Sequence, residues 1–176
     1  MYGVCKVAGE LLGNYYHTRY GVYTRSVRFP GIISSVTLPG GGTTDYAVEI
    51  FYSAVKGEQF TCPVPDNVYM DMMYMPDALR ATVELMEADP AKLKHRNSFN
   101  IAAMSFTPEI IREVVERHVP GFQMEYNVDP VKDVISRSWP NSLDDTCARE
   151  EWGWKPEWDL ESMTKDMLEK VAAKLK

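Results

Sequence analysis

The stretch MYGVCKVAGELLGNYYHTRYGVYTRSVRFPGII, residues 1–33, decides the fold class. Its first half carries apolar residues at helical spacing, namely Val4, Val7, Ala8, Leu11, Leu12, Tyr15 and Tyr16. We expect this helix to end near Tyr20, because Gly21 suits the left-handed conformation that follows many helices. Residues 22–29 are rich in β-branched and aromatic side chains, which is typical of a strand. A helix that leads directly into a strand predicts an α/β protein.

The rest of the chain continues this alternation of helices and strands. We predict strands at 60–64, 98–102 and 122–128, a short apolar run at 70–75, and helices at 43–57, 76–88, 107–118, 144–152 and 160–175. Thr43 or Thr44 is suited to cap the first of these helices, and Gly57 to end it. The pattern predicts parallel pairing for at least some of the strands.

Composition excludes several classes of function. The 176 residues have a net charge of −6, which argues against broad binding to nucleic-acid phosphates. No apolar stretch is long enough to span a membrane, and no basic segment followed by an apolar run marks a signal peptide. The three cysteines are isolated along the chain, so we expect no disulfide framework. These features predict a soluble cytoplasmic protein with reduced thiols.

A Tyr-x-x-x-Lys element, Tyr2 to Lys6, lies in the first predicted helix. Residues four apart share one helix face, so the lysine ammonium is placed to stabilise the phenolate form of the tyrosine. Such a phenol can exchange a proton with a substrate hydroxyl while hydride is transferred. The motif is short, and a second match, Tyr52 to Lys56, lies late in an amphipathic helix, where we interpret it as structural.

The segment Gly40-Gly41-Gly42-Thr43-Thr44-Asp45 leads from a glycine loop into a helix N-terminus. Such an end can hold a carboxylate or another anion through its free N–H groups. It is not a phosphate loop, because no lysine follows the last glycine. The alternative is a flexible turn followed by a helix cap.

Metal and thiol chemistry have little support in the sequence. His17, His95 and His118 lie in different elements, and no histidine or cysteine pair has ligand spacing, so we predict no metal site. Cys5 lies beside Lys6, which favours its thiolate, but nothing else indicates a nucleophilic site.

Several motifs occur together and in order along the whole chain. They are Tyr2-Gly3-x-x-Lys6-x-x-x-Glu10, Val27-Arg28-Phe29-Pro30-Gly31-Ile32-Ile33-Ser34, Pro39 to Ala47, Met72-Met73-Tyr74-Met75, Ser105-Phe106-Thr107-Pro108-Glu109, Ser138-Trp139-Pro140, and Asp144 to Trp154. This series resembles the extended short-chain dehydrogenase/reductase superfamily, also called the NAD-dependent epimerase/dehydratase superfamily. Within it, the series is similar to the L-threonine 3-dehydrogenases of short-chain type. The segments around Gly40–Ala47 and Ser138–Pro140 favour the threonine enzymes.

The resemblance implies a set of functional residues. Tyr2 and Lys6 are the implied catalytic pair, with Tyr2 as general acid/base. The implied contacts to NAD are Lys6, Phe29, Pro30 and Ile32, and those to the amino-acid substrate are Gly42, Thr43, Thr44 and Trp139. The substrate carboxylate suits the helix N-terminus after the glycine loop.

The resemblance also implies that parts of the family's fold are missing. The chain corresponds to the C-terminal part of a Rossmann-type fold with its small substrate-binding domain, without the nucleotide-binding half and its glycine fingerprint. We expect one truncated unit, in which residues 1–38 are a remnant of the Rossmann-type domain and residues 39–176 are mostly substrate-binding region. The apolar face of the first helix and the strand after it would then be uncovered, which predicts a homo-oligomer.

Two functions therefore stand beside the threonine dehydrogenase interpretation. In the first, the chain is a fragment of a nucleotide-sugar epimerase or dehydratase, since those enzymes share the late Trp-Gly-Trp segment. Alternatively, it is a non-catalytic α/β remnant that serves in oligomerisation. In every case the resemblance implies NAD as the cofactor, and we expect this chain alone to bind NAD poorly, because the resemblance gives it no counterpart of the half that holds the adenosine.

Overall fold

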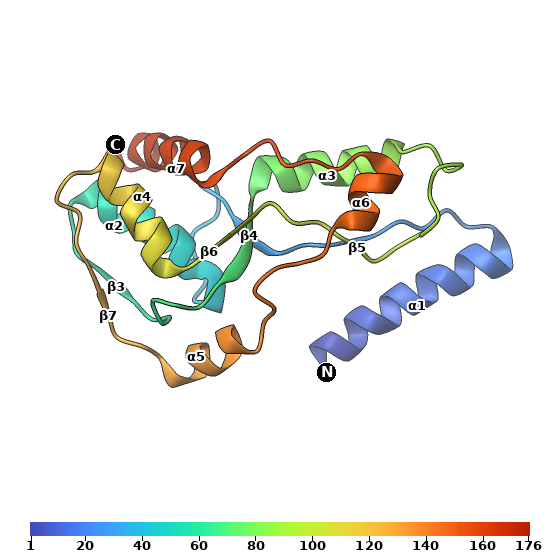
Figure 1. Cartoon of the computed structure of the whole chain (residues 1–176), viewed down its shortest axis with the longest axis horizontal. Helices are drawn as coiled ribbons and strands as arrows, with labels where there is room; N and C mark the ends of the chain where they lie inside the picture. Colours follow the sequence, from blue (N-terminus) through green and yellow to red (C-terminus); the bar gives the residue numbers. More distant parts are fainter.

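Seven α-helices and seven short strands alternate along residues 1–176 of the computed structural model (Figure 1). The helices are α1 (Tyr2–Tyr20), α2 (Tyr46–Lys56), α3 (Met75–Glu87), α4 (Pro108–His118), α5 (Pro130–Arg137), α6 (Thr146–Trp152) and α7 (Leu160–Lys174), and a 3₁₀ turn, η1 (Thr43–Asp45), precedes α2. The strands are β1 (Val27–Arg28), β2 (Gly31–Ile33), β3 (Phe60–Cys62), β4 (Met70–Tyr74), β5 (Phe99–Asn100), β6 (Met104–Phe106) and β7 (Met124–Tyr126). The predicted α/β class is confirmed.

The strands form three small sheets. Strand β4 is central in the largest, pairing in parallel with β2 and antiparallel with β6. The other two sheets are parallel pairs, β1 with β5 and β3 with β7. The predicted parallel pairing is therefore present, and each parallel partner is reached through an intervening helix, as such connections require.

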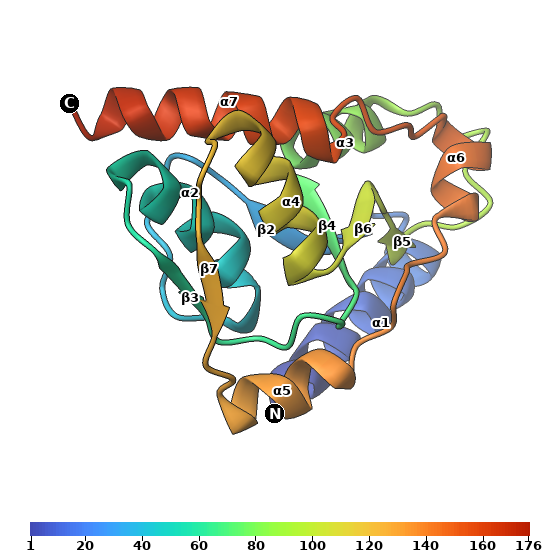
Figure 2. The same cartoon turned by 60° about the vertical axis from the view of Figure 1, so that its left-hand side comes forward.

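Strand β4 divides the interior into two cores, because successive side chains on a strand point to opposite faces. Met70 and Met72 belong to the larger core, which α2, α4 and α7 cover (Figure 2). Met73 belongs to the smaller core, which includes residues of α3, α6 and β5. Every residue of β4 is buried, including the one charged residue of the strand, Asp71.

Local signals in the sequence set most helix ends. Gly21, Gly57 and Gly153 follow α1, α2 and α6 with φ angles of 68°, 71° and 78°, values that favour glycine. The Thr107 hydroxyl accepts a hydrogen bond from the Ile110 amide at the start of α4. These predicted boundaries are confirmed.

The strand predicted over residues 22–29 is only partly formed. Val27 and Arg28 alone pair with a neighbour, since β5 offers only Phe99 and Asn100 as partners. The Thr24 hydroxyl donates instead to the carbonyl of Gly13 in α1 (2.9 Å). Extended structure resumes after Pro30 as β2.

Two elements are not predicted by the sequence analysis. Strand β6 exists because Met104–Phe106 finds an antiparallel partner in β4. Helix α5 begins at a local capping signal: Asp129 precedes Pro130, and its carboxylate accepts the amides of Val131 and Lys132.

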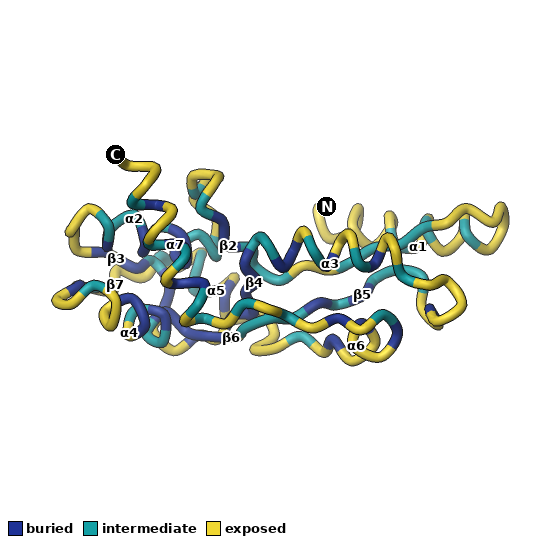
Figure 3. The backbone as a smooth tube through the Cα atoms, turned by 90° about the horizontal axis from the view of Figure 1, so that it is seen from above, coloured by how far each residue is buried: buried dark blue, intermediate teal, exposed yellow.

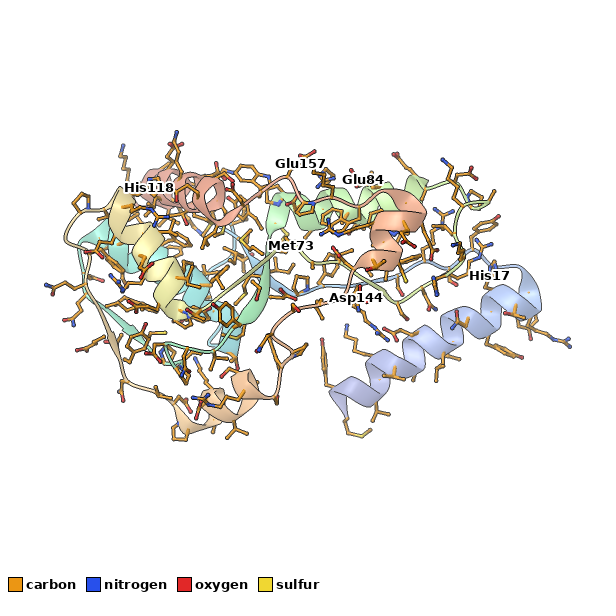
Figure 4. All side chains as sticks on the ribbon, viewed as in Figure 1. His17, Met73, Glu84, His118, Asp144 and Glu157 are labelled. Atoms are coloured by element: carbon orange, nitrogen blue, oxygen red, sulfur yellow. The ribbon has the colours of Figure 1, made fainter.

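Helix α1 has no buried residue, and most of its length is exposed (Figure 3). Polar contacts attach it to the body. The Arg28 guanidinium binds the Glu10 carboxylate (2.6 Å), and the Asn97 amide donates to the Glu10 carbonyl (2.7 Å). Near its end, the His17 ring lies 3.0 Å from the carbonyl oxygen of Val22 (His17 is labelled in Figure 4). None of the helices has the length and apolar character needed to cross a membrane.

One buried hydroxyl gives a stability prediction. Tyr46 is fully buried, its hydroxyl has no hydrogen-bond partner, and burial raises its pKa. We expect Tyr46→Phe to leave the free energy of unfolding unchanged or to raise it by up to about 1 kcal/mol, because the variant removes an unpaired polar group. Tyr74→Phe is the matched control, since the Tyr74 hydroxyl donates to Asp166 (2.5 Å) and its loss should cost about 1 kcal/mol. Urea unfolding measures both variants. Equal decreases in the free energy of unfolding for Tyr46→Phe and Tyr74→Phe would contradict the prediction.

Candidate functional site

A cavity of about 480 Å³ lies where β2 and the η1 turn meet the segment after α5. The residues that line it are Phe29, Pro30, Gly31, Ile32, Thr44, Asp71, Trp139, Pro140 and Leu143. Its size is that of a site for a small organic molecule. Five of the residues singled out in the sequence meet here, although they come from three separated parts of the chain: Phe29, Pro30, Ile32, Thr44 and Trp139.

Gly31 allows this part of the cavity wall to close. A Cβ atom at Gly31 would lie 2.5 Å from the Met72 sulfur and 2.9 Å from the Thr44 methyl carbon. Both distances are shorter than van der Waals contact. The absence of a side chain at Gly31 therefore lets β2 lie close to both β4 and Thr44.

We expect Gly31→Ala to lower the free energy of unfolding by about 1–3 kcal/mol, as overpacking does, and to displace Thr44. Gly40→Ala is the matched control, because a Cβ atom there meets nothing within 4 Å. Chemical denaturation of both variants measures the difference. If Gly40→Ala lowered the free energy of unfolding as much as Gly31→Ala, the close approach of β2 to Met72 and Thr44 would not explain the loss.

The glycine loop is organised by Asp45. One oxygen of its carboxylate accepts the amides of Gly40 (2.7 Å) and Gly42 (2.8 Å). Those two N–H groups are therefore already occupied by an anion from the chain itself. Thr44 lines the cavity, whereas Gly42 and Thr43 are not among its lining residues.

Asp71 is the ionisable residue of this cavity, and the sequence analysis does not single it out. It is 7% exposed, and its carboxylate accepts the backbone amide of Leu143, another cavity residue. Burial raises the pKa of Asp71, the Leu143 hydrogen bond lowers it, and the nearby Asp145 raises it further. The available signal was its position in an otherwise apolar buried run, where an ionisable side chain is unusual.

Tyr2 and Lys6 form a pair on α1, but neither lines this cavity. The Lys6 ammonium lies 5.3 Å from the centre of the Tyr2 ring, as the four-residue spacing predicts. Tyr2 is 79% exposed. Lys6 lines a second, more polar cavity of about 340 Å³ between α1 and residues 24–27.

One cluster of potential metal ligands comes from elements far apart in sequence. Ligand atoms of His95, Cys147 and Glu151 lie within 4.8 Å of one another, an arrangement that ligand spacing along the chain did not reveal. Hydrogen bonds account for much of it, because the Glu151 carboxylate binds the amides of Lys94 and His95 and the His95 ring. The cluster thus ties the loop after α3 to α6.

Known proteins resemble this chain in both sequence and fold. No family model matches the chain. An uncharacterized epimerase/dehydratase of Staphylococcus aureus (strain MRSA252) is 58% identical over 174 residues, covering 99% of this chain and 54% of that protein. The L-threonine dehydrogenase of Clostridium difficile is 57% identical with a TM-score of 0.95, covering 98% of this chain and 54% of that one.

A more distant structure shows the same fold. The UDP-glucose 4-epimerase of Thermotoga maritima is 20% identical with a TM-score of 0.79, over 99% of this chain and 54% of that one. The resemblance to epimerase-like short-chain dehydrogenases is therefore confirmed in both sequence and fold. The chain spans about half the length of the relatives it matches.

Proposed function

We propose that this chain carries the substrate-binding and acid/base part of an NAD-dependent L-threonine 3-dehydrogenase. The reaction oxidises the 3-hydroxyl of L-threonine to give 2-amino-3-oxobutanoate and NADH. The observation that supports it most is the cavity in which Phe29–Ile32, Thr44 and Trp139 converge. Similarity to a threonine dehydrogenase at 57% identity, against 20% for the sugar-nucleotide epimerase, favours threonine over a nucleotide sugar.

The residues present fit one end of NAD and not the other. Phe29, Pro30 and Ile32 give the cavity an apolar wall suited to a nicotinamide ring. The glycine loop does not suit the pyrophosphate, because Asp45 already occupies the amides of Gly40 and Gly42. When bound, NAD supplies the hydride acceptor. The adenosine end would be held by the half of the relatives that this chain does not include.

The candidate site residues have the following roles in this proposal. Tyr2 acts as a phenolate, which the Lys6 ammonium stabilises, and accepts the proton of the substrate 3-hydroxyl to become a neutral phenol. Lys6 also binds the nicotinamide ribose. Thr44, with Gly42 and Thr43 beside it, contacts the amino-acid part of the substrate. Trp139 covers the cavity and limits the access of water. In this proposal, residues 1–38 contribute the acid/base part and residues 39–176 mostly the substrate-binding part.

Because neither Tyr2 nor Lys6 lines the cavity, we infer that the chain alone does not turn over. Catalysis depends on holding both reactants in place, and α1 needs the absent half to be placed against the cavity. The test mixes this chain with the separately expressed N-terminal half of the Staphylococcus aureus relative and measures threonine-dependent NADH formation. We expect no activity from either half and activity from the mixture. A stable complex of the halves that binds NAD but does not oxidise threonine would refute the proposal.

The exposed face of α1 supports a second role in assembly. Val4 is 65% exposed and Leu11 is 63% exposed, and neighbouring apolar side chains on the helix are also open to solvent. Contiguous apolar surface of this kind marks association. We propose that the chain forms a homo-oligomer through α1 and the adjacent strand surface. Sedimentation should show a species larger than one chain, and a monomer at all concentrations would exclude this role.

A further inference from the structure

Asp71 is the sole ionisable side chain in the lining of the cavity. It lies on β4 between Met70 and Met72, which point into the larger core, so its own side chain points to the opposite face of the strand. That face is where the cavity lies. The carboxylate is therefore placed in the cavity by strand alternation and not by a mobile loop.

The carboxylate has no cationic partner. Besides burial, three groups affect its pKa: the Leu143 amide, the Asp145 carboxylate and the Ser105 hydroxyl. None of these groups is positively charged. The Ser105 hydroxyl is also committed elsewhere, since it donates to the Asn141 carbonyl (2.6 Å). A buried carboxylate of this kind is costly unless a positive charge compensates it. A ligand that brings a cation into the cavity would supply that compensation.

We propose that Asp71 binds the ammonium group of the amino-acid substrate and thereby selects 3-hydroxy amino acids over 3-hydroxy acids. The inference rests on the proposed function for the identity of the substrate. Charge complementarity supports the inference. The cavity offers one anionic side chain among uncharged residues, and the ammonium is the one cationic group of an amino acid such as threonine. A site built to pair a polar group of its ligand rejects analogues that lack the group.

The same carboxylate connects the ligand to the segment that carries Trp139. Asp71 accepts the amide of Leu143, and Trp139, Pro140 and Leu143 all line the cavity. Ammonium binding therefore takes place at the group that anchors this segment. Asp71 serves both to recognise the substrate and to position the residue that covers it.

The test measures binding of L-threonine and of 3-hydroxybutyrate, which lacks the ammonium, to the full chain by calorimetry. Asp71→Asn is the informative variant, because the amide oxygen of asparagine can still accept the Leu143 amide while the charge is removed. Asp66→Asn is the matched control, an exposed aspartate outside the cavity lining. Circular dichroism checks the fold of each variant, and Asp71→Ser provides a second variant should Asp71→Asn fail to fold.

We expect L-threonine to bind at least about 10-fold more tightly than 3-hydroxybutyrate to the unmodified chain. Asp71→Asn should weaken L-threonine binding by about 10- to 100-fold and leave 3-hydroxybutyrate unchanged. Equal weakening of both ligands, no change, or no binding of L-threonine to the unmodified chain would overturn the inference. NADH formation by the mixed halves is independent of this pattern, so failure of the reaction with the binding pattern intact would refute the proposed function alone.

Discussion

Asp77→Ala should lower the free energy of unfolding by about 3–5 kcal/mol, because it removes a buried carboxylate that pairs with an arginine and accepts two backbone amides. The Asp77 side chain is 1% exposed and binds the Arg80 guanidinium at 2.7 Å. It also accepts the amides of Glu157 and Trp158, both at 3.1 Å. Truncation would leave the two backbone amides without their acceptor, would remove the buried anion that faces the guanidinium, and would weaken the attachment of the segment before α7 to α3.

Glu84→Ala is the matched control for this prediction. Glu84 binds the same guanidinium at 2.7 Å, but its side chain is 38% exposed, so its loss should cost less than about 1 kcal/mol. Glu84 and Glu157 flank this network near α3 (Figure 4). Urea denaturation compares the two variants. Similar losses for Asp77→Ala and Glu84→Ala would show that burial of the carboxylate does not determine its contribution.

Tyr2→Phe should reduce the turnover of the mixed halves by about 10²- to 10⁴-fold, as removal of a general acid/base does. Because Tyr2 is 79% exposed in this chain, we expect the free energy of unfolding to stay the same. The Michaelis constant for threonine should change much less than the turnover number, since the hydroxyl acts on the reacting proton. Steady-state NADH formation measures both quantities.

The second Tyr-x-x-x-Lys match gives the control for Tyr2→Phe. Tyr52 lies on α2, and its hydroxyl accepts a hydrogen bond from Lys174 (3.2 Å), so Tyr52→Phe should leave turnover unchanged. An enzyme with full activity after Tyr2→Phe would remove the tyrosine from the mechanism. Loss of activity in both variants would mean that the effect is not specific to the catalytic pair.

Elements with local signals were predictable from the sequence, and elements that depend on distant partners were not. Helix α2 was predicted because its start at a glycine loop and its end at Gly57 are local features. The strand at residues 22–29 was predicted too long, because strand pairing depends on β5, some 70 residues further along the chain. Strand β6 was missed for the same reason.

The residues of the candidate site likewise differ in how far the sequence predicts them. The family motifs predicted Phe29, Thr44 and Trp139, and the structure brings them to one cavity. Asp71 is harder to predict, because four of the five residues of its strand are apolar or aromatic and dominate the pattern. Alternation along a buried strand would have identified it, since Met70 and Met72 share a face that Asp71 cannot share.

The polar attachment of α1 has a consequence for hydrogen exchange. A helix that buries no side chain has little to lose when it detaches, so its amides should exchange by local opening at a small free-energy cost. The amides of α2, whose apolar face lies in the larger core, should exchange only through global unfolding. Tyr2 and Lys6 are thus carried by the least protected helix of the chain, and the free energy that orders them must come from whatever binds to α1.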